Sequence, residues 1–213
     1  MEHISLVSFG LHDGPVVRLR CPYCRHVGTF DSVGKGVQVN RTSREFLGVR
    51  RCPNTACAAA IFVVASPTGE LLSSFPPELL DFDSSSVPTE IVSSLEEALQ
   101  CHAVGCYRAA AIMVRRTLED VCADRGASGS NLKERLSALG RSVVLPSELL
   151  DGLDALRLLG NDAAHVEAQT FDNIERKEVE LAIDVTKEVL KAVFQYAELV
   201  GRLQALKKTQ DGA

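Results

Sequence analysis

Residues 75–88 read FPPELLDFDSSSVP, and the pattern of apolar residues differs on the two sides of this stretch. Prolines followed by a serine cluster neither continue a strand nor begin a long helix. Before the stretch, residues 14–66 are rich in Val, Thr, Phe and Gly, with short runs such as VVRLR that are typical of strands. After it, apolar residues recur with a helical period. The sequence therefore predicts an α+β protein, mainly α, with a small β module at 1–70, a linker at 71–87 and a helical bundle at 88–208.

The composition indicates a globular protein with its own core. The chain has 213 residues, of which 46% are hydrophobic. No apolar run approaches the roughly eighteen residues of a membrane span. The first ten residues, MEHISLVSFG, lack the basic flank and apolar stretch of a secretory signal. We therefore expect a cytoplasmic protein with no membrane partner.

The net charge of −5 is unevenly distributed. Residues 1–66 contain eight basic and four acidic side chains, so a basic module precedes an acidic body. A basic module suits a phosphate backbone, and we expect RNA or another nucleic acid as a partner. Only three aromatic residues of the module are close in sequence to these basic residues and could stack on bases: Tyr23, Phe30 and Phe46. An equally favoured alternative to nucleic-acid binding is that the basic side chains form a solvated face, which helps the module dock on the acidic helical domain. The eight basic residues are Arg18, Arg20, Arg25, Lys35, Arg41, Arg44, Arg50 and Arg51.

Four cysteines of the β module have the spacing of a metal site. Cys21 and Cys24 form CPYC, and Cys52 and Cys57 form CPNTAC. Two such knuckles can direct four thiolates to one zinc ion, which would stabilise a small module short of large apolar residues. Four thiolates leave no open coordination position, so we expect one structural zinc per chain rather than a catalytic one. Unligated thiols are the alternative, and His26 is a possible substitute ligand.

Helix signals follow the linker in regular order. A first helix is predicted from Pro88 or Thr89, and a second from about Gly105 to the GASGS stretch at 126–130. Asn131 is predicted to cap a third helix that ends at Gly140. A fourth begins near Pro146 or Ser147, and the last follows a capping-box-like Asp172-x-x-Glu175. An apolar stripe predicts that this last helix packs on several others or on a second subunit: Val179, Ile183, Thr186, Leu190, Val193, Ala197 and Val200.

The stretch RLLGNDAAH at 157–165 is the one place in the helical domain where polar residues gather beside a buried seam. If the fourth helix is continuous, Arg157, Asn161 and His165 follow one another at i, i+4 along one edge. Gly160 costs about 1 kcal/mol in a helix interior relative to alanine. Either another helix, such as YRAAAIMVRR, approaches closely there, or Gly160 ends the helix. The apolar period favours continuity.

These motifs together resemble a known bacterial family. CPYC and CPNTAC, then EEALQCHAVGCYRAAAIMVRRTLEDVC, then LRLLGNDAAH and a long final helix resemble domain-of-unknown-function family 4145 over nearly the whole chain. The resemblance implies a zinc-ribbon-like module followed by a HEPN-like helical domain. Many HEPN domains are dimeric ribonucleases of toxin, defence and RNA-processing systems. It therefore implies a homodimer with a defence or stress association and a possible protein partner.

The same resemblance implies a candidate catalytic set. HEPN nucleases use an arginine and a histidine separated by four to six residues, which here correspond to Arg157 and His165, with Asn161 between them. The gap in this chain is seven residues, which departs from the pattern. Arg115, Arg116 and Glu119 are candidate supporting residues, either as a phosphate-binding set or as an ion-pair network between helices.

Two functions follow from these observations. The first is a HEPN-like binding or accessory protein associated with nucleic acid and holding a structural zinc. The alternative is a metal-independent endoribonuclease that uses Arg157 and His165 in a dimeric site. The acidic body and the stretched spacing favour the first.

Overall fold

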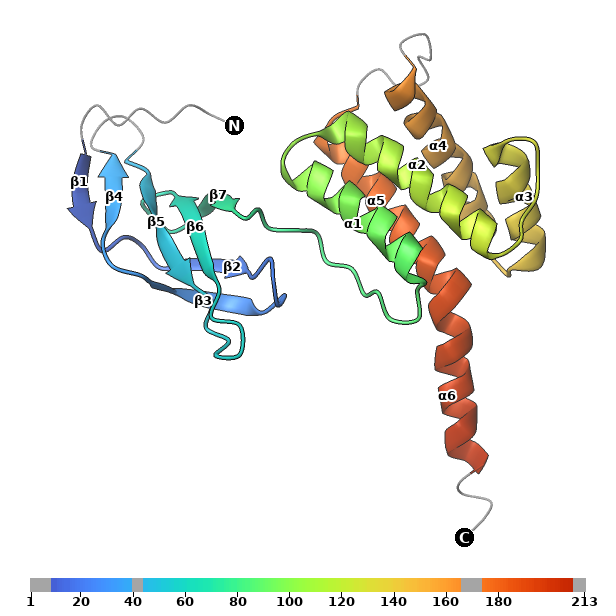
Figure 1. Ribbon diagram of the computed structural model, residues 1–213, viewed down its shortest axis with the longest axis horizontal. Helices are drawn as coiled ribbons and strands as arrows, with labels where there is room; N and C mark the ends of the chain where they lie inside the picture. The colour runs from blue at the N-terminus through green and yellow to red at the C-terminus, as the bar shows by residue number, and fades with distance from the viewer. Residues whose placement is uncertain (1–8, 40–43, 166–173, 209–213) are drawn as a thin grey trace. The chain divides into compact units, whose positions relative to one another are not determined.

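The computed structural model describes residues 9–39, 44–165 and 174–208. It divides into two compact units, residues 1–81 and residues 82–213. The first unit contains the strands and the second contains the helices (Figure 1). The prediction of an α+β protein, mainly α, is therefore confirmed.

The first unit is a seven-stranded antiparallel sheet built around β5. β5 pairs with β6 along its whole length on one side. On its other side it pairs with β4 near its start and with β3 near its end. The strands are β1 (Phe9–His12), β2 (Val17–Arg20), β3 (Val27–Ser32), β4 (Gly36–Val39), β5 (Phe46–Arg51), β6 (Ala60–Ala65) and β7 (Leu71–Phe75).

The sheet extends beyond the predicted end of the β module at residue 70. β7 pairs with β6 through Phe75 opposite Phe62, so five residues assigned to the linker belong to the sheet. The Ser66–Gly69 turn makes this possible, because Gly69 has a φ of +90° and its N–H donates to the Ser66 carbonyl. A strand directly after a tight turn can pair with the strand before the turn, even when prolines follow it.

The core of the sheet unit follows the alternation of its strands. Val17 and Leu19 of β2 are buried, whereas Arg18 between them is exposed. Phe30, Ile61 and Val63 complete this core, and two of the four cysteines, Cys21 and Cys52, are buried in it. The cysteine cluster therefore continues the apolar core rather than lying on an exposed loop.

The second unit contains helices at the predicted places. Asn131 caps α3, because its side-chain oxygen accepts the Glu134 N–H at 3.1 Å. α3 runs two residues beyond the predicted end at Gly140. The predicted Asp172 lies outside the described residues, and the last helix starts from a capping box formed by Glu175 and Glu178. The helices are α1 (Thr89–Ala103), α2 (Tyr107–Asp124), α3 (Leu132–Ser142), α4 (Ser147–Ala164), α5 (Arg176–Leu190) and α6 (Tyr196–Lys208), with a π-helical turn η1 (Lys191–Gln195) between the last two.

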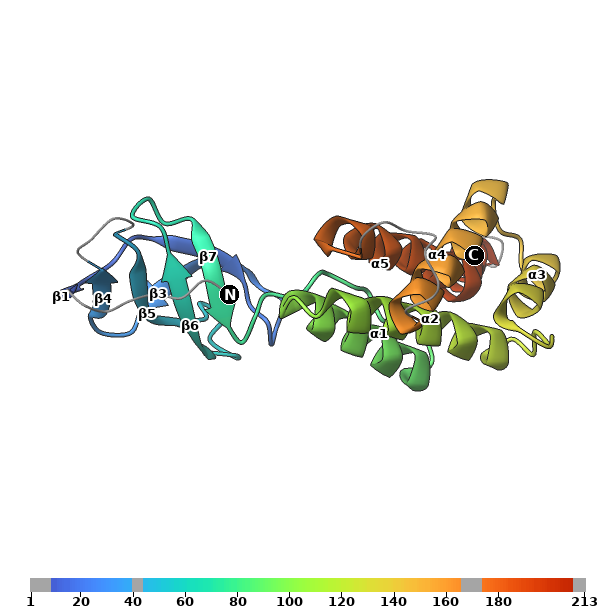
Figure 2. The same cartoon turned by 90° about the horizontal axis from the view of Figure 1, so that it is seen from above.

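α2 lies at the centre of the helical unit. It lies beside α1 in one layer, and α4 and α5 pack over these two helices (Figures 1 and 2). Leu118 and Val121 of α2 are fully buried, as are Leu95 of α1 and Ile183 of α5. The apolar faces of α1, α2, α4 and α5 are therefore covered by neighbouring helices, which is the condition for a stable bundle.

The apolar stripe of the last helix is only partly buried. Val179 and Ile183 are buried as predicted, and burial continues to Phe194. Beyond it, Ala197 and Val200 are exposed, because α6 continues from η1 past the other helices (Figure 1). In the described part of the chain, no helix combines the length and the apolar character that crossing a bilayer requires.

Candidate metal centre and helical site

Two tight turns present the four cysteines. In the first, Cys21 donates its N–H to the His26 carbonyl at 2.8 Å and accepts the Arg25 N–H at 3.0 Å. In the second, Cys52 donates its N–H to Ala59 at 2.9 Å and Cys57 donates to Asn54 at 2.9 Å. Both turns thus fold the chain back on itself, so that each pair of cysteines faces the same space.

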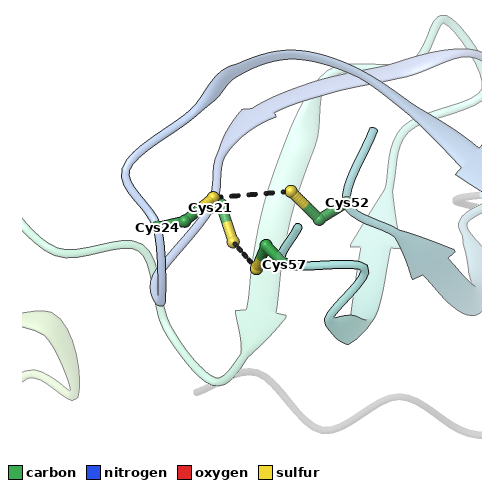
Figure 3. Close-up of side chains that lie close together, drawn as sticks. All are labelled: Cys21, Cys24, Cys52 and Cys57. Atoms are coloured by element: carbon green, nitrogen blue, oxygen red, sulfur yellow. Dashed lines mark hydrogen bonds between the residues drawn. The ribbon is translucent and has the colours of Figure 1, made fainter. Parts of the chain in front are cut away.

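The four sulfur atoms lie close enough together to bind one metal ion. Cys21 Sγ is 3.8 Å from Cys57 Sγ, and Cys24 Sγ is 3.6 Å from Cys52 Sγ. All four sulfurs lie within 4.8 Å of one another, and Figure 3 shows their side chains converging from the two turns. A tetrahedral ion with metal–sulfur distances of about 2.3 Å separates its sulfurs by about 3.8 Å. The cluster can therefore bind a metal ion without rearrangement of the backbone.

The backbone around the sulfurs favours thiolates at selected positions. A hydrogen bond from the backbone of His26 lowers the pKa of Cys24 to about 7. Burial raises the pKa of Cys52 to about 12, against a smaller lowering effect of the Asn54 backbone. Four close thiols of this kind cannot all ionise without a cation, and a bound metal supplies that charge.

His26 does not join the cluster. The four cysteines are the one group of three or more His, Cys, Asp or Glu residues with metal-ligand geometry in the described residues. His26 is exposed, and its contribution to the first turn is its backbone carbonyl. The remaining cysteines, Cys101, Cys106 and Cys122, lie in the helical unit.

Several basic residues of the sheet unit have structural partners. Arg50 is buried, donates to the Pro15 carbonyl at 2.9 Å and lies over the Phe46 ring. Arg20 pairs with Asp81 at 2.7 Å, and Arg51 pairs loosely with Asp31 at 3.6 Å. Arg41 lies outside the described residues. Within the described part of this unit, the exposed basic residues without an ion pair are Arg18, Lys35 and Arg44.

The aromatic residues available for stacking differ from those that the sequence indicated. Phe30 and Phe46 are buried in the core, and of the three expected aromatics only Tyr23 is exposed. Phe62 and Phe75 are exposed instead, at 41% and 74%. They lie directly opposite each other on β6 and β7, and Phe62 also lies opposite Val49 of β5, which is 37% exposed. These three residues form an exposed apolar row across the sheet, which we call the Phe62–Phe75 row.

In the helical unit, α4 continues through Gly160, as predicted. A Cβ atom at Gly160 would lie 2.6 Å from the Cβ of Arg115 and 3.3 Å from the carbonyl oxygen of Ala111. The absence of a side chain therefore lets α2 approach α4 closely. This contact brings Arg115 to the part of α4 that carries the predicted site.

The arginines around this contact are engaged with carboxylates of the same chain. Arg115 pairs with Glu119 at 3.2 Å and also donates to the Arg157 carbonyl at 3.4 Å. Arg157 pairs with Asp154 at 2.9 Å, and its side chain is 20% exposed. Arg115 and Glu119, two of the candidate supporting residues, therefore pair with each other within α2.

Arg116 does not join the Arg115–Glu119 pair. It pairs with Asp120 at 3.1 Å, and Asp120 accepts a hydrogen bond from Ser94 of α1 at 2.6 Å. Arg116 therefore faces α1 rather than Glu119. Consecutive helical residues point about 100° apart, which separates Arg116 from the Arg115–Glu119 pair.

His165 lies outside the helix. α4 ends at Ala164, and His165 has extended backbone angles with φ of −126° and ψ of 122°. Its N–H still donates to the Asn161 carbonyl at 3.0 Å, and its side chain is exposed. The helical stripe therefore contains Arg157 and the half-buried Asn161, while His165 is the residue that follows the helix.

Two features of the helical unit were not anticipated. A pocket of about 330 Å³ lies between α3 and α4, and Asp154, the partner of Arg157, forms part of its wall. In addition, His102 of α1 is 5% exposed, with Nε2 3.4 Å from a Glu180 oxygen of α5. His102 follows the buried residues Ile91, Leu95 and Ala98 at the same three- and four-residue steps. This spacing in the sequence could have indicated that His102 is buried.

Comparison with known proteins identifies the helical region. A family model described as a domain of unknown function, DUF4145, matches residues 96–209. No curated protein and no solved structure matches the chain.

Proposed function

The chain belongs to the DUF4145 family, and we propose that it is a cytoplasmic, nucleic-acid-associated accessory protein of a prokaryotic defence or stress system. In this proposal a zinc-ribbon-like β module binds single-stranded RNA, and a HEPN-like helical domain contributes binding and dimerisation. The defence association and a protein partner within that system rest on the resemblance of the helical motifs.

The Phe62–Phe75 row is the observation that carries RNA binding. Bases of single-stranded nucleic acid stack on exposed aromatic side chains of a sheet, and such stacking tolerates any sequence. Arg51 lies two residues from Val49 on the same face of β5 and is exposed. Its loose pairing with Asp31 at 3.6 Å leaves it available for a phosphate.

Binding of a fluorescein-labelled single-stranded RNA of about twelve nucleotides tests this site. We expect Phe62→Ala and Phe75→Ala each to weaken affinity by roughly tenfold, in line with stacking energies of about 1–3 kcal/mol per base. Leu11→Ala is the matched control, because Leu11 is a 69% exposed apolar residue of β1 in the same unit. Equal affinity in all four proteins, measured by fluorescence anisotropy, would reject the row as the RNA site.

The metal of the cysteine cluster is proposed to be zinc with a structural role. Four thiolate ligands in tetrahedral positions match closed structural zinc sites, which have no position for water or substrate. Elemental analysis of protein purified without added metal should find about one zinc per chain in wild type. Cys57→Ser should reduce this content, whereas Cys122→Ser should not. A folded wild-type protein free of zinc would contradict the assignment.

The helical domain is proposed to bind rather than to catalyse. Arg157 and Arg115 are both held by intrachain carboxylates, and His165 is exposed beyond the end of α4. An arginine that stabilises a phosphorane must be free to meet it in the transition state. Arg157 would first have to exchange Asp154 for the substrate.

An endoribonuclease is the second candidate function. It is favoured by the contact at Gly160, which brings Arg115 beside the part of α4 that carries Arg157 and Asn161 and precedes His165. In such a site the histidine would transfer a proton and an arginine would stabilise the charged phosphorane.

Incubation with total RNA separates the two functions. Wild type should leave the RNA intact if the helical domain only binds. Cleavage that is lost in Arg157→Ala and His165→Ala, with unchanged circular dichroism spectra, would establish the ribonuclease instead. Arg141→Ala is a matched control, because Arg141 is an exposed arginine of α3 without an ion pair in the described residues.

A homodimer through α6 is the proposed assembly. Tyr196, Leu199, Leu203 and Leu206 follow the 3–4–3 spacing of a coiled-coil seam, and each is 52–67% exposed. Light scattering coupled to gel filtration should report a dimer for wild type and a monomer for Leu199→Glu. Gln204→Glu, also on α6 but outside the seam, should remain dimeric. A wild-type monomer at micromolar concentration would contradict the proposal.

A further inference from the structure

Two cysteines outside the metal cluster are held close together by the end of α1. The N–H of Cys106 donates to the Cys101 carbonyl at 2.8 Å, and the N–H of Gly105 donates to the His102 carbonyl at 3.0 Å. Gly105 has a φ of +80°. This pair of bonds around a left-handed glycine is a Schellman motif, in which the side chains of the first and sixth residues commonly touch. Here both of these residues are cysteines.

The backbone geometry suits a covalent link between them. With a hydrogen bond of 2.8 Å between Cys106 N and Cys101 O, standard bond lengths keep the two Cα atoms within about 7 Å along a bent path. Disulfides bridge Cα atoms that are roughly 4.4–6.8 Å apart. Their Cα atoms are therefore close enough for a disulfide to span.

We propose that Cys101 and Cys106 are an oxidation site, at which hydrogen peroxide converts the two thiols to a reversible disulfide. The Cys106 sulfur attacks the peroxide, so that an S–O bond forms, the O–O bond breaks and one water leaves, giving a sulfenic acid. The Cys101 sulfur then displaces the hydroxyl, forming the S–S bond and releasing a second water. The two sulfurs lose two electrons in total, and the peroxide gains them.

The environments of the two thiols indicate which of them reacts with the oxidant first. Cys106 is exposed at the start of α2, whereas Cys101 is half-buried. Burial raises the pKa of the Cys101 thiol, with smaller contributions from Cys106 and Glu97. Because the thiolate is the nucleophile, the exposed Cys106 meets the oxidant first and Cys101 resolves the sulfenic acid.

The site lies beside the buried histidine of α1. His102 is the second residue of the motif, and the ring of Tyr107 lies 5.7 Å from its ring. A disulfide here ties the turn between α1 and α2 next to this pair. This modification is independent of the proposed RNA binding, because it lies in the helical unit and uses neither the metal cluster nor the Phe62–Phe75 row.

Hydrogen peroxide treatment of the full-length, metal-loaded protein tests the site. After oxidation, the protein is denatured, alkylated with N-ethylmaleimide and weighed by mass spectrometry. Wild type should lose two alkylation sites, and peptide fragmentation should assign both to Cys101 and Cys106. Dithiothreitol should restore them. In Cys101→Ser, dimedone should instead trap a sulfenic acid on Cys106. A zinc-sensitive dye in parallel shows whether the metal cluster is retained.

Two variants test the geometry rather than the mere presence of thiols. Gly105→Ala keeps both cysteines and meets no atom closer than 4.0 Å, but it strains the left-handed backbone. It should slow disulfide formation several-fold. Cys122→Ser is the matched control and should oxidise like wild type, because Cys122 begins the same type of turn with Ala127 in the sixth position. Failure of wild type to lose the two sites, or their loss to another pair of cysteines, would overturn the proposal.

Discussion

Gly160 shows how one missing side chain fixes the contact between two helices. A helix interior disfavours glycine, yet α4 continues through this position because α2 occupies the space that a Cβ would need. The same contact places Arg115 within 3.4 Å of the Arg157 carbonyl. The identity of residue 160 thus decides where the arginines of α2 lie relative to α4.

Gly160→Ala should therefore destabilise the helical unit despite its better helix propensity. The added methyl would lie 2.6 Å from the Arg115 Cβ, and overpacking of this kind costs about 1–3 kcal/mol. The gain in propensity is about 1 kcal/mol, which leaves a net loss of about 1 kcal/mol. Gly201→Ala in α6 is the control, since nothing lies within 4 Å of its Cβ position, and it should be neutral or stabilising. Urea denaturation followed by circular dichroism measures both; a more stable Gly160→Ala protein would contradict the close contact.

His102 makes stability depend on pH. Burial lowers the pKa of His102 below its ordinary 6.5, with Arg176 and Lys187 acting in the same direction and Glu180 opposing them. The folded state therefore holds the neutral ring. Below pH 6.5 the unfolded chain binds a proton that the folded chain resists, so the free energy of unfolding falls as the pH drops through this window. His102→Gln should show a shallower decline between pH 7 and pH 5 in urea denaturation. An unchanged slope would show that other groups dominate.

At the scale of elements, local residues determine where helices begin, but they do not determine how much of a helix is buried. Asn131 begins α3 through its side-chain hydrogen bond, and Glu175 with Glu178 begins α5. In contrast, η1 interrupts the long C-terminal helix, and the residues of α6 that follow it are exposed. A π-helical turn changes the direction in which an apolar stripe faces. α6 is exposed on all sides because it extends past the other helices, so the apolar stripe that is buried along α5 has no helix among the described residues to pack on along α6.

Asn131→Ala should weaken α3 by about 1 kcal/mol, because the Glu134 N–H loses its acceptor. Asn131→Asp retains an oxygen acceptor at this helix start and should keep most of the stability. The midpoint of urea unfolding reports the difference. If the alanine and aspartate variants unfold together, the cap contributes nothing measurable to the fold.

For the whole molecule, the two units differ in what stabilises them. The helical unit buries a continuous apolar core around α2, whereas the sheet unit is small and includes two of the four clustered cysteines in its core. Small domains with limited cores depend on disulfides or metals for stability. The metal cluster should therefore matter to one unit and not to the other.

Removal of the metal should unfold the sheet unit selectively. With a strong chelator present, tryptic cleavage should become rapid within residues 1–81, while the helical signal at 222 nm is retained. Because bound metal stabilises only the folded module, readdition of zinc should restore protection. Cys21→Ser should behave like the chelated wild type without any chelator. Simultaneous loss of protection in both units would show that they fold as one.

The sequence alone determined what depends on local chemistry. The cysteine spacing, the change of apolar period at 75–88 and the cap at Asn131 act over a few residues, so the cysteine cluster, the fold class and the start of α3 could be predicted. The tertiary structure decided which side chains meet. It placed Phe30 and Phe46 in the core and Phe62 and Phe75 on the surface, joined Arg157 to Asp154 and Arg116 to Asp120, and left His165 beyond α4. These outcomes depend on sheet register and on how closely helices approach, which are set by contacts between segments far apart in the chain.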